Sequence, residues 1–144
     1  LFNRGLSPLY KKRSSRLSIV GCTGIRNSYI DGARPLDRIK SFINILISNR
    51  AKIKKYGCPV GTLCTELAKI NHTSHAEANK VFTLFRIWLR RQFTLLGHKA
   101  DSDMLAMHLL VRSQGVATMA NAFHDERFIK QEVKQMCNWL KSCT

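Results

Sequence analysis

From Pro35 almost to the C-terminus, apolar residues recur at three- and four-residue steps, the spacing that places side chains on one face of an α-helix. Glycine and proline interrupt this pattern at Gly57, Pro59 and Gly97, where helices commonly end or begin. After residue 34, no stretch alternates apolar and polar residues for long enough to form a useful strand. The sequence therefore predicts an all-α fold, a bundle of about five to six helices after residue 35.

The ends of the expected helices carry local signals. Proline at positions 35 and 59 fits the first turn of a helix, where its missing N–H group costs nothing. Ser74 and Glu77 have the spacing of a capping box, Asp101 is expected to cap the next helix, and Asp125 to start the last one. On this basis we expect helices at residues 35–57, 59–70, 74–96, 101–123 and 125–140.

Positive charge is concentrated at the start of the chain. The 144 residues carry a net charge of +15, and the first 56 residues hold +11 of it. Residues 1–34 are basic and rich in residues that interrupt helices, so we divide the chain into a basic leader, 1–34, and a helical domain, 35–144. A field of this sign attracts polyanions, above all nucleic acid, although the charge also suits a merely solvated surface.

The residue pattern contains no recognised catalytic or cofactor site. It has no glycine-rich phosphate loop, no nucleophile elbow and no carboxylate pair in an apolar setting, so we expect no enzyme activity and no cofactor. The best candidate zinc ligands, Cys58, Cys64, His72 and His75, are not spaced as in structural zinc sites, and we expect no metal. Five cysteines without a signal peptide, and no apolar run of about 18 residues, indicate a cytoplasmic protein without a membrane span.

One segment has a more specific pattern. Residues 57–67 read GCPVGTLCTEL, with a Gly-Cys-Pro start, a second glycine and a short helix that ends in Glu-Leu. A long helix with a central Trp88 follows, and then an acidic cap, a Leu- and Met-rich helix that contains Gly115, and a last amphipathic helix. In this order of features, residues 35–144 resemble the regulatory domain of TetR-family transcriptional repressors.

The resemblance implies a helix-turn-helix DNA-binding domain before the helical domain. Residues 1–6 are similar to the end of its first helix and residues 9–12 to the end of its recognition helix, but only two residues separate them. Tyr10, Lys11 and Lys12 are therefore the residues that we expect to contact an operator in double-stranded DNA. Either the full protein carries a helix-turn-helix that this sequence holds only in part, or the chain is naturally truncated.

The same resemblance implies a pocket for a small, mostly apolar effector, and a homodimer. The residues expected to form the pocket are Phe42, Leu46, Leu63, Phe85, Trp88, Leu89 and His108. The last two helices are expected to form a four-helix bundle with those of a second copy, through Leu105, Leu109, Met119, Phe128, Met136 and Trp139. Each apolar residue in these sets also suits an ordinary core position.

Together these expectations describe a ligand-responsive repressor. Its effector binds more tightly to the arrangement of the protein that does not fit DNA, so effector binding causes the repressor to release DNA. Two other functions fit the sequence. One is a small basic helical protein that binds nucleic acid without an effector, and the other is a dimeric interaction module that has lost DNA binding. The response to ligand separates the repressor from a general nucleic-acid binder, which shows steep salt dependence and little sequence preference.

Overall fold

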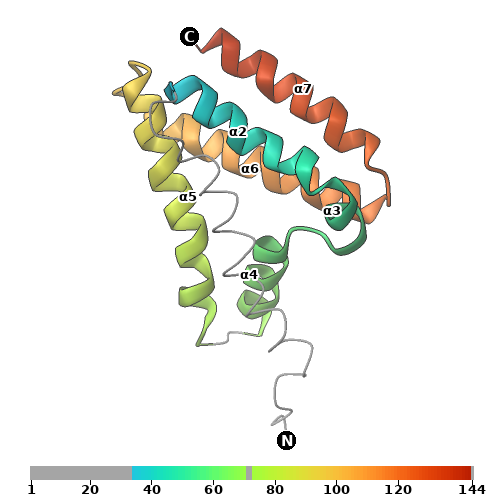
Figure 1. Ribbon diagram of the computed structural model, residues 1–144. Coiled ribbons are helices and arrows are strands. Elements are labelled where there is room, and N and C mark those ends of the chain that lie inside the picture. The colour runs from blue at the N-terminus through green and yellow to red at the C-terminus, as the bar shows by residue number, and fades with distance from the viewer. Residues whose placement is uncertain (1–33, 71–72, 144) are drawn as a thin grey trace, which may run out of the picture.

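The computed structural model describes residues 34–70 and 73–143, and every regular element within these ranges is a helix. The helices, labelled as in Figure 1, are α2 (Pro35–Ser48), α3 (Arg50–Tyr56), α4 (Pro59–Lys69), α5 (His75–Leu95), α6 (Ser102–Ala122) and α7 (Arg127–Ser142). The all-α prediction is confirmed, and most helix boundaries lie within two residues of those expected.

Three helices, α2, α6 and α7, lie side by side and form the main bundle (Figure 1). α5 crosses one end of this bundle and packs on α6 and α2, whereas α4 packs mainly on α5 and touches the bundle only near its start. The core between the bundle helices and α5 is closed to solvent by large apolar side chains, among them Ile39, Ile43, Leu89, Phe93, Leu109, Ile129, Met136 and Leu140. Burial of this apolar surface is the main source of stability in the fold.

The expected first helix is divided at Asn49. This residue has φ −108° and ψ 10°, and its backbone N–H and its side-chain amide both donate to the Ile45 carbonyl oxygen, at 3.0 Å each. Asparagine side chains compete with helical hydrogen bonding in this way. α3 therefore begins as a separate short helix, which turns Ile53 into the core.

The residues expected to start helices behave differently from one another. Asp125 accepts a hydrogen bond at 2.9 Å from the backbone N–H of Arg127, the first residue of α7, although Glu126 occupies the N-cap position. Asp101 does not cap α6, because its carboxylate lies 3.2 Å from Nδ1 of His98 instead. Ser74 makes no capping hydrogen bond at the start of α5, so the expected capping box is wrong.

His98 ties the turn between α5 and α6 to the end of α7. Its Nε2 lies 2.6 Å from the carbonyl oxygen of Cys143, and its Nδ1 faces Asp101. Both partners are hydrogen-bond acceptors, so the doubly protonated imidazolium suits this place best. The hydrogen bond to Cys143 is the largest cause that raises the pKa of His98. The C-terminal end of α7 is thus anchored to the rest of the bundle.

α4 has a small apolar face of its own. Val60, Cys64 and Leu67 are buried at steps of four and three residues, but they do not belong to the main apolar core. The sequence periodicity predicts Leu63 and Ile70 on this face as well, yet Leu63 is half-buried and Ile70 is 62% exposed. The inward face of α4 is therefore centred on Cys64, and it meets α5 rather than the main bundle.

Candidate ligand cavity

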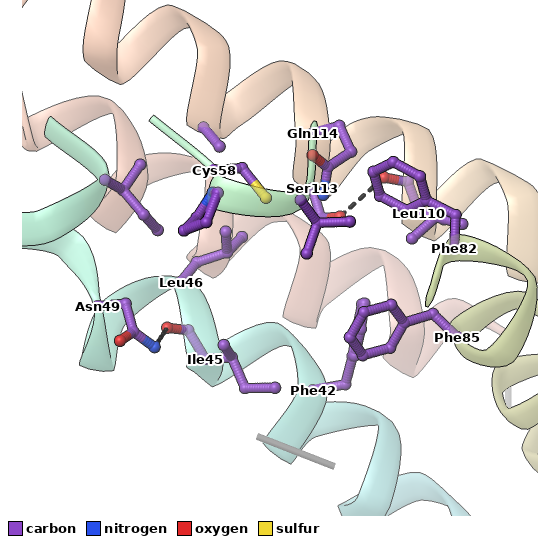
Figure 2. Close-up of a pocket in the computed structure, with 14 residues that line it drawn as sticks. Phe42, Ile45, Leu46, Asn49, Cys58, Phe82, Phe85, Leu110, Ser113 and Gln114 are labelled. Atoms are coloured by element: carbon purple, nitrogen blue, oxygen red, sulfur yellow. Dashed lines mark hydrogen bonds between the residues drawn. The ribbon is translucent and has the colours of Figure 1, made fainter. Parts of the chain in front are cut away.

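A cavity of about 110 Å³ lies where the start of α4 faces α2, α5 and α6 (Figure 2). Its 14 lining residues are Phe42, Ile45, Leu46, Asn49, Ile53, Cys58, Pro59, Val60, Phe82, Phe85, Leu110, Ser113, Gln114 and Ala117. None of the 14 is charged, and the polar groups among them are two amides, one hydroxyl and one thiol. A mostly apolar cavity with a few polar groups is the usual form of a small-molecule site.

The turn from α3 into α4 shapes one wall of the cavity. Gly57 has φ +70°, in the left-handed region that glycine adopts without the strain of a Cβ atom. The turn is held from α6 by Asn121, whose side-chain amide donates to the Lys54 carbonyl oxygen at 3.0 Å. Pro59 then begins α4 at a position where no N–H donor is needed. Gly57 and Pro59 of the GCPVG segment thus set the direction of α4.

The second glycine of GCPVG allows a close contact between α4 and α6. A Cβ atom at Gly61 would lie 2.5 Å from Oε1 of Gln114, much closer than non-bonded atoms pack. The Gln114 side chain therefore lies against the backbone of α4, at the cavity wall. Any larger residue at position 61 displaces this amide.

Three phenylalanines give the cavity its largest apolar surfaces. Phe42 and Phe85 meet edge to face, with ring centroids 5.6 Å apart and an interplanar angle of 61°. Phe82 and Phe85 come from adjacent turns of α5, and Figure 2 shows both on one side of the cavity. Both rings of α5 are only half-buried, so a molecule in the cavity would cover apolar surface that is otherwise exposed.

The polar groups of the cavity differ in whether they are already hydrogen-bonded. The Asn49 amide donates to the Ile45 carbonyl oxygen, and the Ser113 hydroxyl donates to that of Leu110 at 2.7 Å (Figure 2). Within the part of the chain that the structure describes, the side-chain amide of Gln114 has no hydrogen-bond partner. Gln114 is therefore the lining residue with the most hydrogen-bonding capacity left for a ligand.

The thiol behind the cavity wall is not poised for chemistry. Burial raises the pKa of the Cys64 thiol, and nearby Cys58 acts in the same direction. Cys64 is therefore protonated at neutral pH, whereas a nucleophile or metal ligand must be a thiolate. Within residues 34–70 and 73–143, no three His, Cys, Asp or Glu side chains gather as a metal site requires. His72 lies outside the described residues.

Three of the seven residues expected to form a pocket line this cavity: Phe42, Leu46 and Phe85. All three lie on faces of α2 and α5 that meet near the start of α4. Sequence reasoning missed Phe82, which lies one turn before Phe85, and that spacing is a signal that could have identified it. It also missed Gln114, because only the three-dimensional contact with Gly61 singles this amide out.

The other four residues do not line the cavity. Trp88 and Leu89 are further along α5, where they are buried in the main core. Leu63 is half-buried on α4, and the rotation of that helix takes it away from the cavity wall. His108 is exposed on α6, and its ring packs on Trp139 with centroids 4.7 Å apart.

The residues expected at a dimer interface fall into three groups. Leu109 and Met136 have no exposed surface, so these two are corrected to core residues that a second copy cannot reach. Leu105 and Trp139 are partly buried against the same core. Met119 and Phe128 are exposed on α6 and α7 and remain available for an interface.

The outward face of α6 exposes apolar side chains that the sequence analysis did not select. Met104, Val111 and Phe123 are 62% to 66% exposed, and with Met119 they follow one side of the helix. Gly115 lies between Val111 and Met119, and a Cβ atom there would meet nothing within 4 Å. α6 thus carries an outward apolar stripe with a small residue at its centre.

Neither a protein-family model nor a curated protein matches this sequence. Tyr10, Lys11 and Lys12, the expected DNA-contacting residues, lie outside the described residues. Among the described helices, none combines the length and the apolar character needed to cross a membrane.

Proposed function

We propose that this chain is the effector-binding and dimerising part of a ligand-responsive transcriptional repressor of the TetR type. The observation that carries the proposal is the uncharged, mostly apolar cavity between the start of α4 and the main bundle. Its wall includes Cys58, Pro59 and Val60 of the GCPVG segment, which is part of the pattern that carries the resemblance to that family. The effector is a small molecule that covers the exposed faces of Phe82 and Phe85.

Effector binding acts through the position of α4. The buried residues of α4 lie outside the main core, so α4 can shift without disrupting the bundle. A ligand that fits one position of α4 better than another changes the population of the two arrangements. Coupling of this kind is typically worth about 1–3 kcal/mol, which changes DNA affinity by about 5- to 150-fold.

The dimer forms through the outward stripe of α6 together with α7. Contiguous apolar surface of this kind is uncommon on monomers. Phe123 and Phe128 extend the stripe across the α6–α7 turn, where their ring centroids lie 5.6 Å apart. Because Gly115 has open space above it, a second α6 can approach closely at the centre of the stripe.

The cavity is tested by filling it. Ala117 lines the cavity, whereas Ala51 is exposed on α3, so Ala117→Leu and Ala51→Leu make the same change inside and outside it. Toluene at about ten times its Kd should add about 1.4 kcal/mol to the free energy of unfolding of the wild type and of Ala51→Leu. Ala117→Leu should lose this stabilisation. Equal stabilisation of all three proteins, or of none, contradicts ligand binding in this cavity.

The dimer is tested by sedimentation of Val111→Asp, with Ile87→Asp as the control. Both side chains are exposed, but Val111 lies on the α6 stripe and Ile87 lies on α5. We expect the wild type and Ile87→Asp to sediment as dimers at micromolar concentration, and Val111→Asp as a monomer. A monomeric wild type contradicts the proposal.

One observation favours a second function, a nucleic-acid-binding protein without an effector. α3 contains Arg50, Lys52, Lys54 and Lys55 and no acidic residue. DNA-binding measurements separate the two functions. A repressor binds one palindromic duplex best and releases it when an effector is added. A general binder shows steep salt dependence, little preference among sequences and no response to cavity ligands.

A further inference from the structure

We propose that the cavity selects an uncharged molecule of about one aromatic ring that carries a hydrogen-bonding group, and that the Gln114 amide is the residue that recognises this group. The inference rests on the proposed ligand-binding function of the cavity and specifies the chemical class of the ligand. Four observations on the cavity lead to it.

The first observation is the absence of charge. None of the 14 lining residues is acidic or basic, even though the whole chain carries a net charge of +15. Moving an ion from water into an apolar site costs several kcal/mol unless a partner of opposite charge is present there. The positive surface attracts anions to the protein, but the cavity offers them no cationic partner. Its ligand is therefore neutral.

The second observation concerns size and shape. The volume of about 110 Å³ is below that of an apolar cavity of about 150 Å³ that is known to accept benzene. The cavity therefore holds no more than a single ring, and it is open beside the half-buried Phe82 and Phe85. The edge-to-face pair of Phe42 and Phe85 shows that these walls already hold aromatic rings in favourable geometry.

The third observation is the remaining hydrogen-bonding capacity. The donors of Asn49 and Ser113 are bound to backbone carbonyl oxygens of their own helices. The side-chain amide of Gln114 has two N–H donors and a carbonyl acceptor, and no residue of the described chain satisfies them. A ligand hydroxyl can pair with either end of this amide.

The fourth observation is the place of Gln114 in the cavity wall. Its Oε1 lies so close to Gly61 that a Cβ atom there would be 2.5 Å away. The amide therefore lies against the backbone of α4, and Figure 2 places it beside Cys58 and Ser113 on one side of the cavity. The amide that a ligand hydroxyl would meet is thus part of the cavity wall itself.

The experiment compares three single-ring probes on the full chain by calorimetry at pH 7. Toluene has no hydrogen-bonding group, phenol has one, and benzoate is an anion of similar size. Wild type should bind toluene and phenol, and should bind benzoate at least about 100-fold more weakly than phenol. In Gln114→Leu, the ratio of the phenol Kd to the toluene Kd should rise by about tenfold, the effect of one lost hydrogen bond.

Two further variants complete the test. Gly61→Ala keeps Gln114 but displaces its amide, and should raise the same ratio. Gln131→Leu removes an exposed amide on α7, a helix that contributes no lining residue, and should leave the ratio unchanged. An unchanged ratio in both Gln114→Leu and Gly61→Ala overturns the role of Gln114, and benzoate binding as tight as that of phenol overturns the selection for neutral ligands. Absence of binding by all three probes overturns the proposed ligand site itself, and the inference with it.

Discussion

The main bundle and α4 are built differently, although both are helical. In the bundle, residues such as Leu109 and Met136 have no exposed surface and belong to one continuous core. In α4, Val60, Cys64 and Leu67 are buried without joining that core. The cavity lies between the two, and its lining includes residues of both.

This difference assigns stability and response to separate parts of the chain. The continuous core of α2, α5, α6 and α7 provides the free energy that keeps the protein folded. α4 contributes less buried surface, and it is attached through the Gly57 turn and its contact with α5. Elements with few buried apolar contacts open at a lower free-energy cost than the core does. α4 is therefore the element whose position a ligand can change.

The largest expected effect comes from truncating the same residue type in both parts. Leu109 and Leu67 are equally buried leucines of α6 and α4. Leu109→Ala should lower the free energy of unfolding by about 2–5 kcal/mol, as measured by urea denaturation. Leu67→Ala should lower the free energy of unfolding by less. The effect of this substitution cannot exceed the free energy that is needed to open α4 on its own. Equal losses in the two variants contradict the separation of α4 from the bundle.

The Gly57 turn should control α4 more than the bundle. Gly57→Ala places a Cβ atom at φ +70° and 3.3 Å from Oγ1 of Thr62, and should cost about 1–3 kcal/mol. Gly97→Ala is the matched control, because Gly97 has φ +102° in the α5–α6 turn and open space around it. Hydrogen exchange should show faster exchange of α4 amides in Gly57→Ala only. Faster α4 exchange in both variants would show that α4 is not controlled by its own turn.

Changes of pH should affect the bundle and leave α4 unchanged. The pKa of His98 is raised, so its contribution to stability is complete below about pH 6.5 and is lost as the pH rises through the raised value. The difference in Tm between wild type and His98→Gln should therefore be largest at pH 5–6 and shrink above that range. A difference that grows with pH, or a parallel change in the opening free energy of α4 after correction for the intrinsic pH dependence of amide exchange, contradicts this assignment.

The smallest effect is expected from the exposed ion pair between α5 and α6. Arg86 donates two hydrogen bonds to Asp103 and lowers the pKa of that carboxyl group. The contribution of the pair is therefore present above about pH 4 and is lost as the pH falls through the lowered pKa. Asp103→Asn should reduce Tm only slightly at pH 7, and less in 1 M NaCl than at low salt, because both side chains are solvated. A loss comparable to that of Leu109→Ala would show that the polar surface, and not the core, stabilises the bundle.

Sequence periodicity predicted the all-α fold well, because apolar residues at three- and four-residue steps have few other ways to be buried together. The break at Asn49 was missed, since it depends on one side-chain hydrogen bond to Ile45 within an otherwise helical pattern. The inward face of α4 was placed around Leu63 and not Cys64, because the direction of burial depends on where α5 lies.

The cavity was predictable only in part, for a similar reason. Phe42 and Phe85 are aromatic residues on apolar helix faces, and such residues suit a pocket wall or a core equally well. Gln114 gives no signal in the sequence, because its importance comes from the backbone of Gly61 on another helix. Leu109 was assigned to a dimer interface, although the fold of a single chain already buries it.

Hydrogen exchange of the full chain, with and without toluene, tests most directly whether a ligand cavity separates α4 from a stable bundle. Without toluene, the amides of α4 should exchange through an opening of lower free energy than the most protected amides of α6. Toluene should slow the exchange of the α4 amides, because it binds the closed arrangement. If α4 and α6 exchange with the same opening free energy, and toluene changes neither, the account is contradicted.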